Sequence, residues 1–367
     1  MANWLKPFTA GYHFARVSRE TGYEVGNVEG IKDGGSITRN IDTASYESGS
    51  FSYVGPLDLG NDLVRPYLDA TFEDGTRESV PLGTFVVSLP SSNVSGAYSE
   101  GKADMYGRLY EVASARFTEP LRIAKGSNAV DVARMILEDA GLEVIADESG
   151  YTLSQDWAVG LGSSDDDNDT MLGAVNELLG LAGFSSARTD EYGRVLLKKY
   201  YSPSERQPSY EFVEGRNARF LRQVTNERDL SDVANVVLAV YSNQDSTVIG
   251  TARDDDPNSP TSTVSLGWER SAKYRYNDLV SQDEADAKAR ELLANQRSVI
   301  RRVTIQHVYV PTLRAGDIAG LEYPSAGISG SFTVRTGISG GFTVRTQNVT
   351  LGGAAKTKTE LKRTERW

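Results

Sequence analysis

Hydrophobic and aromatic side chains recur at every second position in a stretch near the C-terminus. Val303, Ile305, His307 and Tyr309 share one face of this stretch, which is the pattern of a half-buried β-strand. Pro311 ends the strand pattern because proline has no N–H group to donate to a neighbouring strand.

The residues that follow predict an antiparallel meander. The sequence RAGD at 314–317 is typical of a tight turn, since glycine and aspartate tolerate unusual backbone angles. Short strand patterns follow at 318–323, 332–334, 342–344 and 348–351. Such a series often closes into a small barrel. None of these residues is chemically reactive, so we interpret the segment as a scaffold.

A repeat lies inside this meander. Residues 327–336 read GISGSFTVRT and residues 337–346 read GISGGFTVRT, so that only Ser331 and Gly341 differ. Two copies are too few for a solenoid, which needs about three or more. We interpret the repeat as a local duplication that adds a turn and a strand, or that lengthens a hairpin.

Residues 1–116 also carry strand patterns and predict a first β domain. Residues 63–68 contain Pro66, which predicts an edge strand or a bulge. The sequence EDGT at 73–76 favours a hairpin turn, and residues 80–88 form the strongest strand pattern of this part. The other predicted strands are 36–41, 46–54 and 103–110.

Residues 117–204 predict a compact α+β domain. Ser127 or Asn128 can cap a helix that runs through residue 140, and residues 171–182 predict a second helix. The sequence DEYG at 190–193 predicts a hairpin turn. The predicted apolar faces of the two helices are Val132, Met135, Ile136 and Ala140, and Leu172, Val175, Leu178, Leu179 and Ala182.

The rest of the chain predicts a second β domain that is interrupted once. Residues 205–240 and 300–367 carry strand patterns, including the last residues, 356–367. Between them, residues 241–299 predict a polar loop and a helix that opens with the capping box Ser281–Glu284. The predicted fold class is therefore α+β and mainly β, with an α+β domain between two β domains.

Composition narrows the possible functions. The chain has 367 residues and a formal net charge of −11, which argues against a protein that grips nucleic-acid phosphates. It has no cysteine, which excludes a disulfide framework and a thiolate nucleophile. The sequence has no signal-peptide pattern and no apolar run of the ~18 residues that a membrane helix needs, so we expect a soluble protein made in a cytoplasm.

Candidate reactive residues are few. The two histidines, His13 and His307, have no metal-ligand or catalytic-triad spacing. The acidic run from Asp165 to Asp169 fails the EF-hand pattern, because Thr170 and Asn176 stand where glycine and glutamate belong. We interpret this run as negative charge before a helix N-terminus, with a weak calcium site as the alternative. We predict no catalytic, cofactor-binding or metal-binding residues and no enzyme activity.

The order of these motifs resembles the tail-tip hub, or baseplate hub, family of long-tailed bacteriophages. No single motif is specific, but their order and spacing span nearly the whole chain. Two departures are the doubled repeat and an end at Trp367, where many relatives continue. The segments that carry the resemblance are 35–40, 63–65 and 82–85; 124–128 with the helix to 141; 171–183, 190–193, 200–203 and Arg206; and 285–293 with 313–317.

The resemblance implies a structural virion protein in the distal tail, assembled in the host cytoplasm. Such hubs form homotrimers in which two barrel-like domains per subunit adapt a sixfold tail tube to a threefold tip. The implied partners are the distal tail or tail-tube ring above, and a fibre, spike or tape-measure protein at the tip. DNA would pass through the channel without specific binding, and the exposed barrel edges and the duplicated hairpin would lie at subunit or ring contacts.

By position, the resemblance assigns residues 1–116 to the first barrel and residues 205–240 with 300–367 to the second. Residues 117–204 and 241–299 would be additions to the ring. The main alternative is a carbohydrate-binding adhesin of the tail tip, because the 18 tyrosines and 4 tryptophans could stack on sugars. A wall-degrading enzyme is a third interpretation, and no residue pattern supports it.

Overall fold

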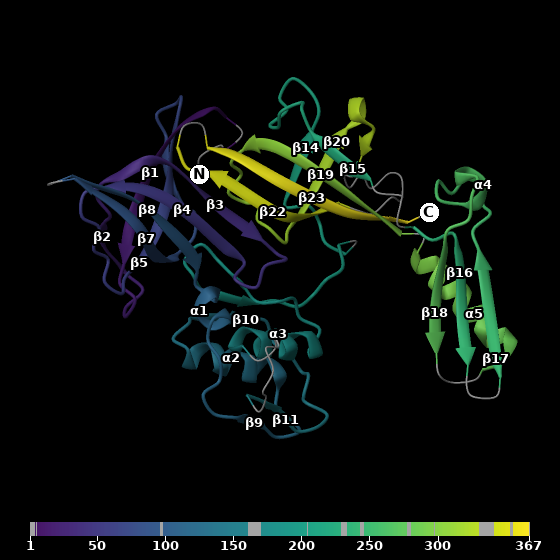
Figure 1. The fold of residues 1–367 in the computed structure, drawn as a ribbon. Coiled ribbons are helices and arrows are strands. Elements are labelled where there is room, and N and C mark those ends of the chain that lie inside the picture. Colours follow the sequence, from purple (N-terminus) through teal and green to yellow (C-terminus); the bar gives the residue numbers. More distant parts are fainter. Residues whose placement is uncertain are drawn as a thin grey trace. The chain divides into compact units, whose positions relative to one another are not determined.

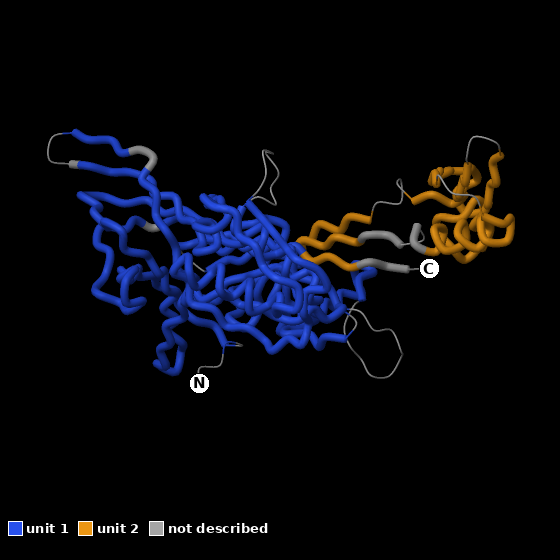
Figure 2. The backbone as a smooth tube through the Cα atoms, turned by 90° about the horizontal axis from the view of Figure 1, so that it is seen from below, with its two compact units in different colours: residues 1–222, 305–360 blue, residues 223–304, 361–367 orange. Residues whose placement is uncertain are grey.

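Strands are more common than helices in the structure, a computed structural model, and the helices gather in a few places (Figure 1). The predicted fold class, mainly β with an α+β part, is confirmed. The chain divides into two compact units, one of residues 1–222 and 305–360 and the other of residues 223–304 and 361–367 (Figure 2). The structure describes residues 4, 6–95, 98–160, 170–203, 205–228, 233–242, 246–276, 280–296, 298–329, 341–352 and 355–366.

The N-terminal β region, residues 8–107, forms one hydrogen-bonded series of strands in the order β3-β4-β8-β7-β5-β1-β2, with β6 beside β5. One face of these strands buries a shared core that includes Phe14, Phe51, Leu68 and Phe85. The strands are β1 (Phe8–Val17), β2 (Glu24–Asn27), β3 (Ile31–Asn40), β4 (Glu47–Val54), β5 (Leu63–Phe72), β6 (Arg77–Pro81), β7 (Phe85–Ser95) and β8 (Tyr98–Gly107).

Of the two features predicted at Pro66, an edge strand or a bulge, the structure shows a bulge, because residues 65–66 of β5 lie opposite three residues, 82–84. Strand β5 has β1 on one side and β6 and β7 on the other. The carbonyl of Pro66 accepts a hydrogen bond from the N–H of Leu82, which lies in the break between β6 and β7. The single strand predicted at 80–88 is therefore two strands, and the break lies opposite the residue that has no N–H to offer.

The helical region, residues 109–203, has α2 and α3 packed against each other (Figure 1). Asn128 caps α2 by accepting hydrogen bonds from two backbone N–H groups, and Thr170 caps α3 by accepting one. Both predicted helices are confirmed, but Met135 is 38% exposed because α2 buries Ala129, Val130, Ala133 and Leu137 beside Val132 and Ile136. The helices are α1 (Leu109–Ala113), α2 (Ala129–Asp139) and α3 (Met171–Leu181).

Short strands complete the helical region. Strands β10 and β13 pair in parallel, and β12 pairs with β13 across the predicted hairpin turn at 190–193. This makes β12 the edge strand of a sheet in the order β10-β13-β12. The strands are β9 (Leu121–Ile123), β10 (Val144–Ala146), β11 (Trp157–Val159), β12 (Arg188–Thr189) and β13 (Val195–Leu197).

The C-terminal β region, residues 210–213 and 305–360, continues the N-terminal sheet. Strand β22 pairs antiparallel with β3, so that Gln347 lies opposite Arg39. Strand β20 pairs with β22 and, in parallel, with β14. The elements are β14 (Tyr210–Val213), β19 (Ser298–Val308), β20 (Ile318–Tyr323), the 3₁₀ turn η2 (Pro324–Ala326), β21 (Ile328–Ser329), β22 (Phe342–Thr350) and β23 (Lys356–Arg366).

The alternating stretch at the C-terminus is confirmed. Val303, Ile305, His307 and Tyr309 are all buried, whereas Gln306 between them is exposed. The predicted turn is present too, since the N–H of residue 317 donates to the carbonyl of residue 314. Most of the repeat, residues 330–340, lies outside the described residues, and the end of its second copy begins β22.

The second unit contains a small sheet in the order β17-β16-β18, with α5 packed against it. Ala285, Ala289 and Leu293 of α5 are buried in its core. The capping box is confirmed, because the N–H of Ser281 donates to the Glu284 carboxylate at 2.9 Å. The elements are β15 (Thr225–Arg228), β16 (Val236–Ser242), β17 (Thr247–Arg253), α4 (Thr263–Leu266), β18 (Ser271–Tyr276) and α5 (Gln282–Gln296).

His307 is held as a neutral, hydrogen-bonded core residue. Its Nδ1 lies 2.7 Å from the carbonyl oxygen of Val308, and its Nε2 lies 2.8 Å from Oγ1 of Thr359. The first contact requires a proton on Nδ1, so Nε2 accepts from the threonine hydroxyl. Burial lowers the pKa of His307 to about 4, because the charged form would lose its hydration.

We expect His307 to make the protein less stable in mild acid. The unfolded chain binds a proton near pH 6.5 and the folded chain near pH 4, so stability is full above pH 6.5 and falls as the pH drops through this window. The loss is up to roughly 3 kcal/mol at 1.36 kcal/mol per pKa unit. Urea denaturation at several pH values should show it, and His307→Gln should remove it. The matched control is His13→Gln, and equal pH dependence in both variants would contradict the assignment.

Candidate functional site

The residues considered for chemistry do not form a reactive centre in the described part of the chain. Nδ1 of His13 lies 2.6 Å from the Asp69 carboxylate, and its ring stacks on Tyr67. His307 is a core residue, and the run from Asp165 to Asp169 lies outside the described residues. Among the described residues, no three His, Asp or Glu side chains are placed to hold a metal ion, and no helix is long and apolar enough to cross a membrane.

Arg39 makes the most deeply buried polar contacts of the first unit. Its Nε donates to Glu47 Oε1 at 2.7 Å, its Nη1 donates to Gln347 Oε1 at 2.9 Å, and its Nη2 donates to the carbonyl of Leu82. The hydroxyl of Thr189 donates to the other carboxylate oxygen of Glu47 at 2.9 Å. We call Arg39, Glu47, Thr189 and Gln347 the Arg39 network.

The Arg39 network joins the three regions of the first unit. Arg39 and Glu47 lie on β3 and β4, Thr189 on β12 of the helical region, and Gln347 on β22. All four side chains are at most 2% exposed. Burial alone would lower the pKa of Arg39, but the charge of Glu47 more than offsets this and raises it. A buried charge pair is tolerated only where every remaining donor and acceptor is satisfied, as it is here.

The turn between β12 and β13 provides a second junction. The hydroxyl of Thr84 accepts from Arg65 Nε at 2.9 Å and donates to the Glu191 carbonyl at 3.0 Å. The Glu191 side chain forms an ion pair with Arg314 of the C-terminal β region. One turn of the helical region therefore contacts both β regions.

Gly193 is required where this turn packs. Its φ is +82°, and a Cβ there would lie 3.0 Å from Cγ of Arg108 and 3.1 Å from Cβ of Thr84. An alanine would thus add crowding to the cost of the left-handed backbone.

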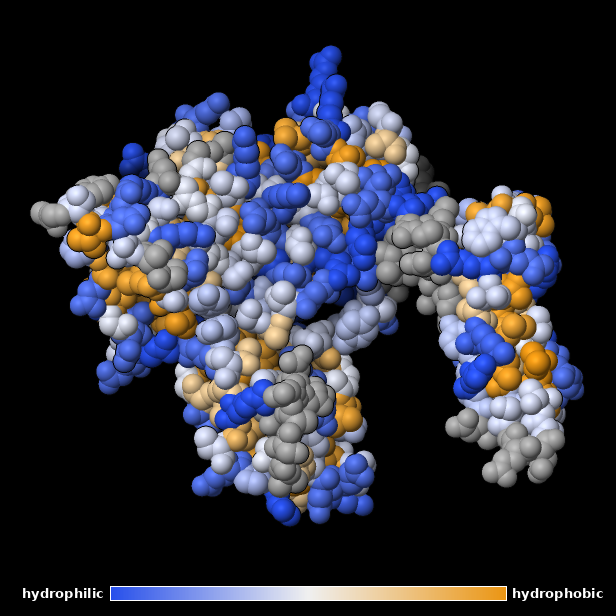
Figure 3. Space-filling model, viewed as in Figure 1, coloured by the Kyte–Doolittle hydropathy of each residue, from blue (hydrophilic) through white to orange (hydrophobic). Residues whose placement is uncertain are grey.

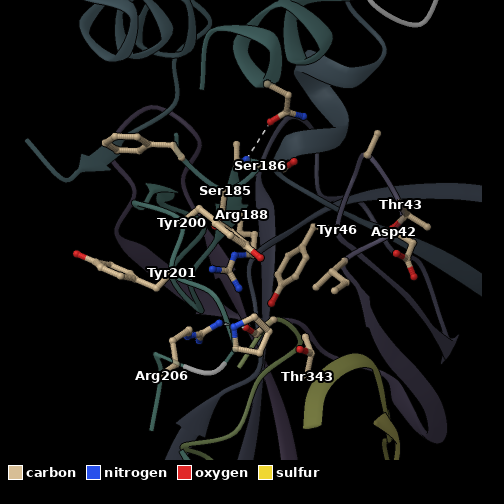
Figure 4. A pocket seen from close by; sticks show the side chains of 17 residues that line it. Asp42, Thr43, Tyr46, Ser185, Ser186, Arg188, Tyr200, Tyr201, Arg206 and Thr343 are labelled. Carbon is tan, nitrogen blue, oxygen red and sulfur yellow. Dashed lines mark hydrogen bonds between the residues drawn. The ribbon is translucent and has the colours of Figure 1, made fainter. Parts of the chain in front are cut away.

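An open cavity of about 680 Å³ lies where the three regions meet (Figure 4). Figure 4 shows Arg188 reaching into it, with Tyr46 and Tyr200 on either side in this view. The hydroxyl of Tyr46 donates to the carbonyl of Ala315 at 2.9 Å, and burial, with the charge of Glu47, raises its pKa to about 12. The lining also includes Asp42, Thr43, Asn176, Ser185, Ser186, Tyr201, Arg206, Gly316 and Thr343.

A smaller hollow of about 340 Å³ shares Arg188 and Arg206 with this cavity and adds Asp317. Nη1 of Arg206 donates to the carbonyl of Gly316 at 2.7 Å, and its Nη2 lies 3.6 Å from the Asp317 carboxylate. Burial raises the pKa of Asp317 against the pull of three nearby arginines, and burial lowers the pKa of Arg206. Asp317 and Arg206 are thus charged groups that are partly shielded from water.

Sequence reasoning had singled out Arg206 and the turn at 190–193, but not the Arg39 network or Arg188. One signal was available, because Arg39 follows the buried Ile37 by two residues and so occupies an inward position of its strand. A charged residue at an inward position implies a buried partner. That signal does not identify the partner, which can lie anywhere in the chain.

Breaking the ion pair between Arg39 and Glu47 should lower the free energy of unfolding. Arg39→Met leaves the Glu47 carboxylate buried without its cation, and we expect a loss of about 3–5 kcal/mol in the free energy of unfolding. Lys6→Gln removes an exposed pair with Asp74 and should cost much less, because water and salt screen exposed charges. Chemical denaturation of both variants tests this, and adding Glu47→Gln to Arg39→Met should restore part of the loss. Equal costs for the two single variants would contradict the role of the network.

The packing of the turn at 190–193 can be tested by substituting two glycines that have similar backbone conformations. Gly193→Ala and Gly141→Ala both place alanine at a φ near +80°, but no heavy atom lies within 4 Å of the added Cβ at Gly141. We expect Gly193→Ala to cost about 1–3 kcal/mol more because of crowding against the N-terminal β region. Thermal melting of both variants gives the difference. A difference near zero would mean that the turn does not pack as described.

Comparison with known proteins supplies the fold. No family model and no curated protein matches the chain. It is similar to the tail protein from Neisseria meningitidis MC58 (TM-score 0.57, 13% identity, 97% of each chain covered). The prophage MuSo2 43 kDa tail protein from Shewanella oneidensis gives 0.55 at 8% identity, covering 96% of this chain and 97% of that one. A chain of the Francisella PdpA–VgrG complex gives 0.56 at 7% identity, covering 99% and 59%.

The match to the two tail proteins runs from one end of the chain to the other, across both β regions and the helical region between them. This protein therefore has the fold of phage tail proteins, as the order of its sequence motifs had implied.

Proposed function

We propose that this protein is a structural component of a phage tail or prophage tail particle, and that it forms a trimeric hub at the distal end. The observation that carries the proposal is the end-to-end match in fold with two tail proteins, at 97% and 96% coverage of this chain. A hub of this kind would adapt a sixfold tube to a threefold tip. Its subunit would contribute two barrel-like domains, one from the N-terminal β region and one from the C-terminal β region.

The internal construction of the first unit supports a mechanical role. Two β regions share one sheet through β22 and β3, and the Arg39 network and the turn at 190–193 fix the helical region to both. Buried, fully bonded polar contacts favour one arrangement of parts over many. A ring that transmits load between a tube and a tip needs such a subunit.

The net negative charge of the chain is compatible with the lining of a channel through which DNA passes. With a net charge of −11, the surface repels phosphates on average, so a bore lined by this protein would not hold DNA. The partners in this proposal are two further copies of the chain, a distal tail or tail-tube ring, and a fibre, spike or tape-measure protein at the tip.

The purified chain should have a mass of about 120 kDa by light scattering, three times its own 40.0 kDa. Averaging of particles in electron micrographs should then show a threefold ring with an open bore. If the chain alone is a monomer, the measurement should be repeated with the tail-tube protein, on which the trimeric ring would then assemble. A monomer that ignores neighbouring tail proteins would refute the hub.

The carbohydrate-binding alternative has one observation in its favour. Tyr200 and Tyr201 lie at the cavity with 61% and 55% of their surfaces exposed, and flat exposed aromatic rings can stack on sugars. Arg188 and Arg206 line the same cavity, and their positive charges favour a ligand with negative charge over a neutral sugar.

A further inference from the structure

The cavity of about 680 Å³ contains a positive charge without a counter-ion. Nη1 of Arg188 donates one long hydrogen bond, of 3.4 Å, to the carbonyl of Ala315. No ion pair of Arg188 occurs among the described residues. A Cβ on Gly316 would lie 1.8 Å from Nη1, so the guanidinium of Arg188 packs against the bare backbone of Gly316. Arg188 therefore has one long hydrogen bond and no ion pair in the described part of the chain, while the Asp317 carboxylate lies near enough to attract it.

The carboxylates nearby already have other cations. Asp317 pairs with Arg206, Glu191 pairs with Arg314, and Asp147 pairs with Lys198. Asp42, at the other side of the cavity, pairs with Arg345. Lys199 lines the adjoining hollow and has no ion pair of its own in the described part of the chain. The site is thus locally positive in a protein whose net charge is −11.

The walls have the composition of a protein–protein contact. Arginine and tyrosine are the residues most enriched at the energetic centres of such interfaces. Tyr200 and Tyr201 are more than half exposed, although most tyrosines bury their rings. Figure 3 shows hydrophobic and hydrophilic residues interspersed over the face that it draws. A volume of about 680 Å³ lies within the usual range of ligand sites.

The backbone beside Arg188 is already hydrogen-bonded within the protein. The N–H of Ala187 donates to Oδ1 of Asn176 at 2.9 Å, and the N–H of Ser185 donates to the carbonyl of Lys198. Side chains of the cavity, rather than a free strand edge, are therefore the groups that can recognise a ligand here.

We propose that this cavity binds an extended acidic segment of another protein, whose carboxylate pairs with the guanidinium of Arg188. Arginine and carboxylate groups match as planar forks with two parallel hydrogen bonds. Tyr200 and Tyr201 cover the apolar parts of the segment, and the hydroxyls of Ser185 and Ser186 meet its polar atoms. The site does not depend on the trimer, so failure of the hub proposal leaves it standing.

The test uses the full chain and a fluorescein-labelled octapeptide of alternating glutamate and threonine, followed by fluorescence anisotropy. Saturable binding is expected, and Arg188→Gln should weaken it about tenfold, since hydrogen bonds to charged groups are worth more than neutral ones. The matched control is Arg275→Gln, an exposed arginine of the second unit that loses the same charge. It should leave affinity unchanged within about twofold. Thermal melting of each variant shows that it is folded.

Two further probes separate the alternatives. The same peptide with lysine in place of glutamate should not bind, and Arg188→Lys should give an intermediate affinity because lysine keeps the charge without the fork. A labelled oligogalacturonate carries carboxylates on sugars. Tighter binding of that probe, with loss in Arg188→Gln, would overturn the peptide assignment in favour of an acidic glycan. No saturable binding of the peptide, or equal losses in Arg188→Gln and Arg275→Gln, would overturn the site itself.

Discussion

The buried pair of Arg39 and Glu47 is the interaction on which the rest of the first unit depends. Two charges removed from water are stable only when each donor and acceptor finds a partner. Here the partners come from the carbonyl of Leu82, from Thr189 and from Gln347, so that both β regions and the helical region must be in place at once. A hydrophobic core would accept several packings, whereas this set of directed bonds accepts one.

The cavity follows from the same arrangement. The turn at 190–193 contacts both β regions, and the strand before it, β12, leads Arg188 into the space between them. Tyr46 adopts a left-handed backbone with φ of 59° and places its hydroxyl on the carbonyl of Ala315. The floor of the cavity is therefore held by the interactions that join the regions, and the exposed Tyr200 and Tyr201 lie at its opening.

Local patterns predicted local structure well. The alternation around His307, the caps at Asn128 and Ser281, and the turn at 314–317 involve residues within a few positions of each other, and all are present. The sequence context of Pro66 predicted an edge strand or a bulge, and only the structure decides between them: residues 65–66 lie opposite three residues, 82–84, which is a bulge in the neighbouring strand. The parallel pairing of β14 with β20 and the hydrogen bond from Arg39 to Gln347 join residues about 100 and 300 positions apart, and no periodicity encodes such contacts. The order of motifs predicted the family fold because it samples the whole chain.

The distance in sequence between Arg39 and Gln347 has a consequence for synthesis. Arg39 leaves the ribosome 308 residues before Gln347. At roughly 5–20 residues per second, this delay is tens of seconds. During this time β3 lacks its neighbouring strand β22, and Arg39 lacks its hydrogen bond to Gln347. We therefore expect the edge of β3 to stay unpaired until β22 has been synthesised and can pair with it.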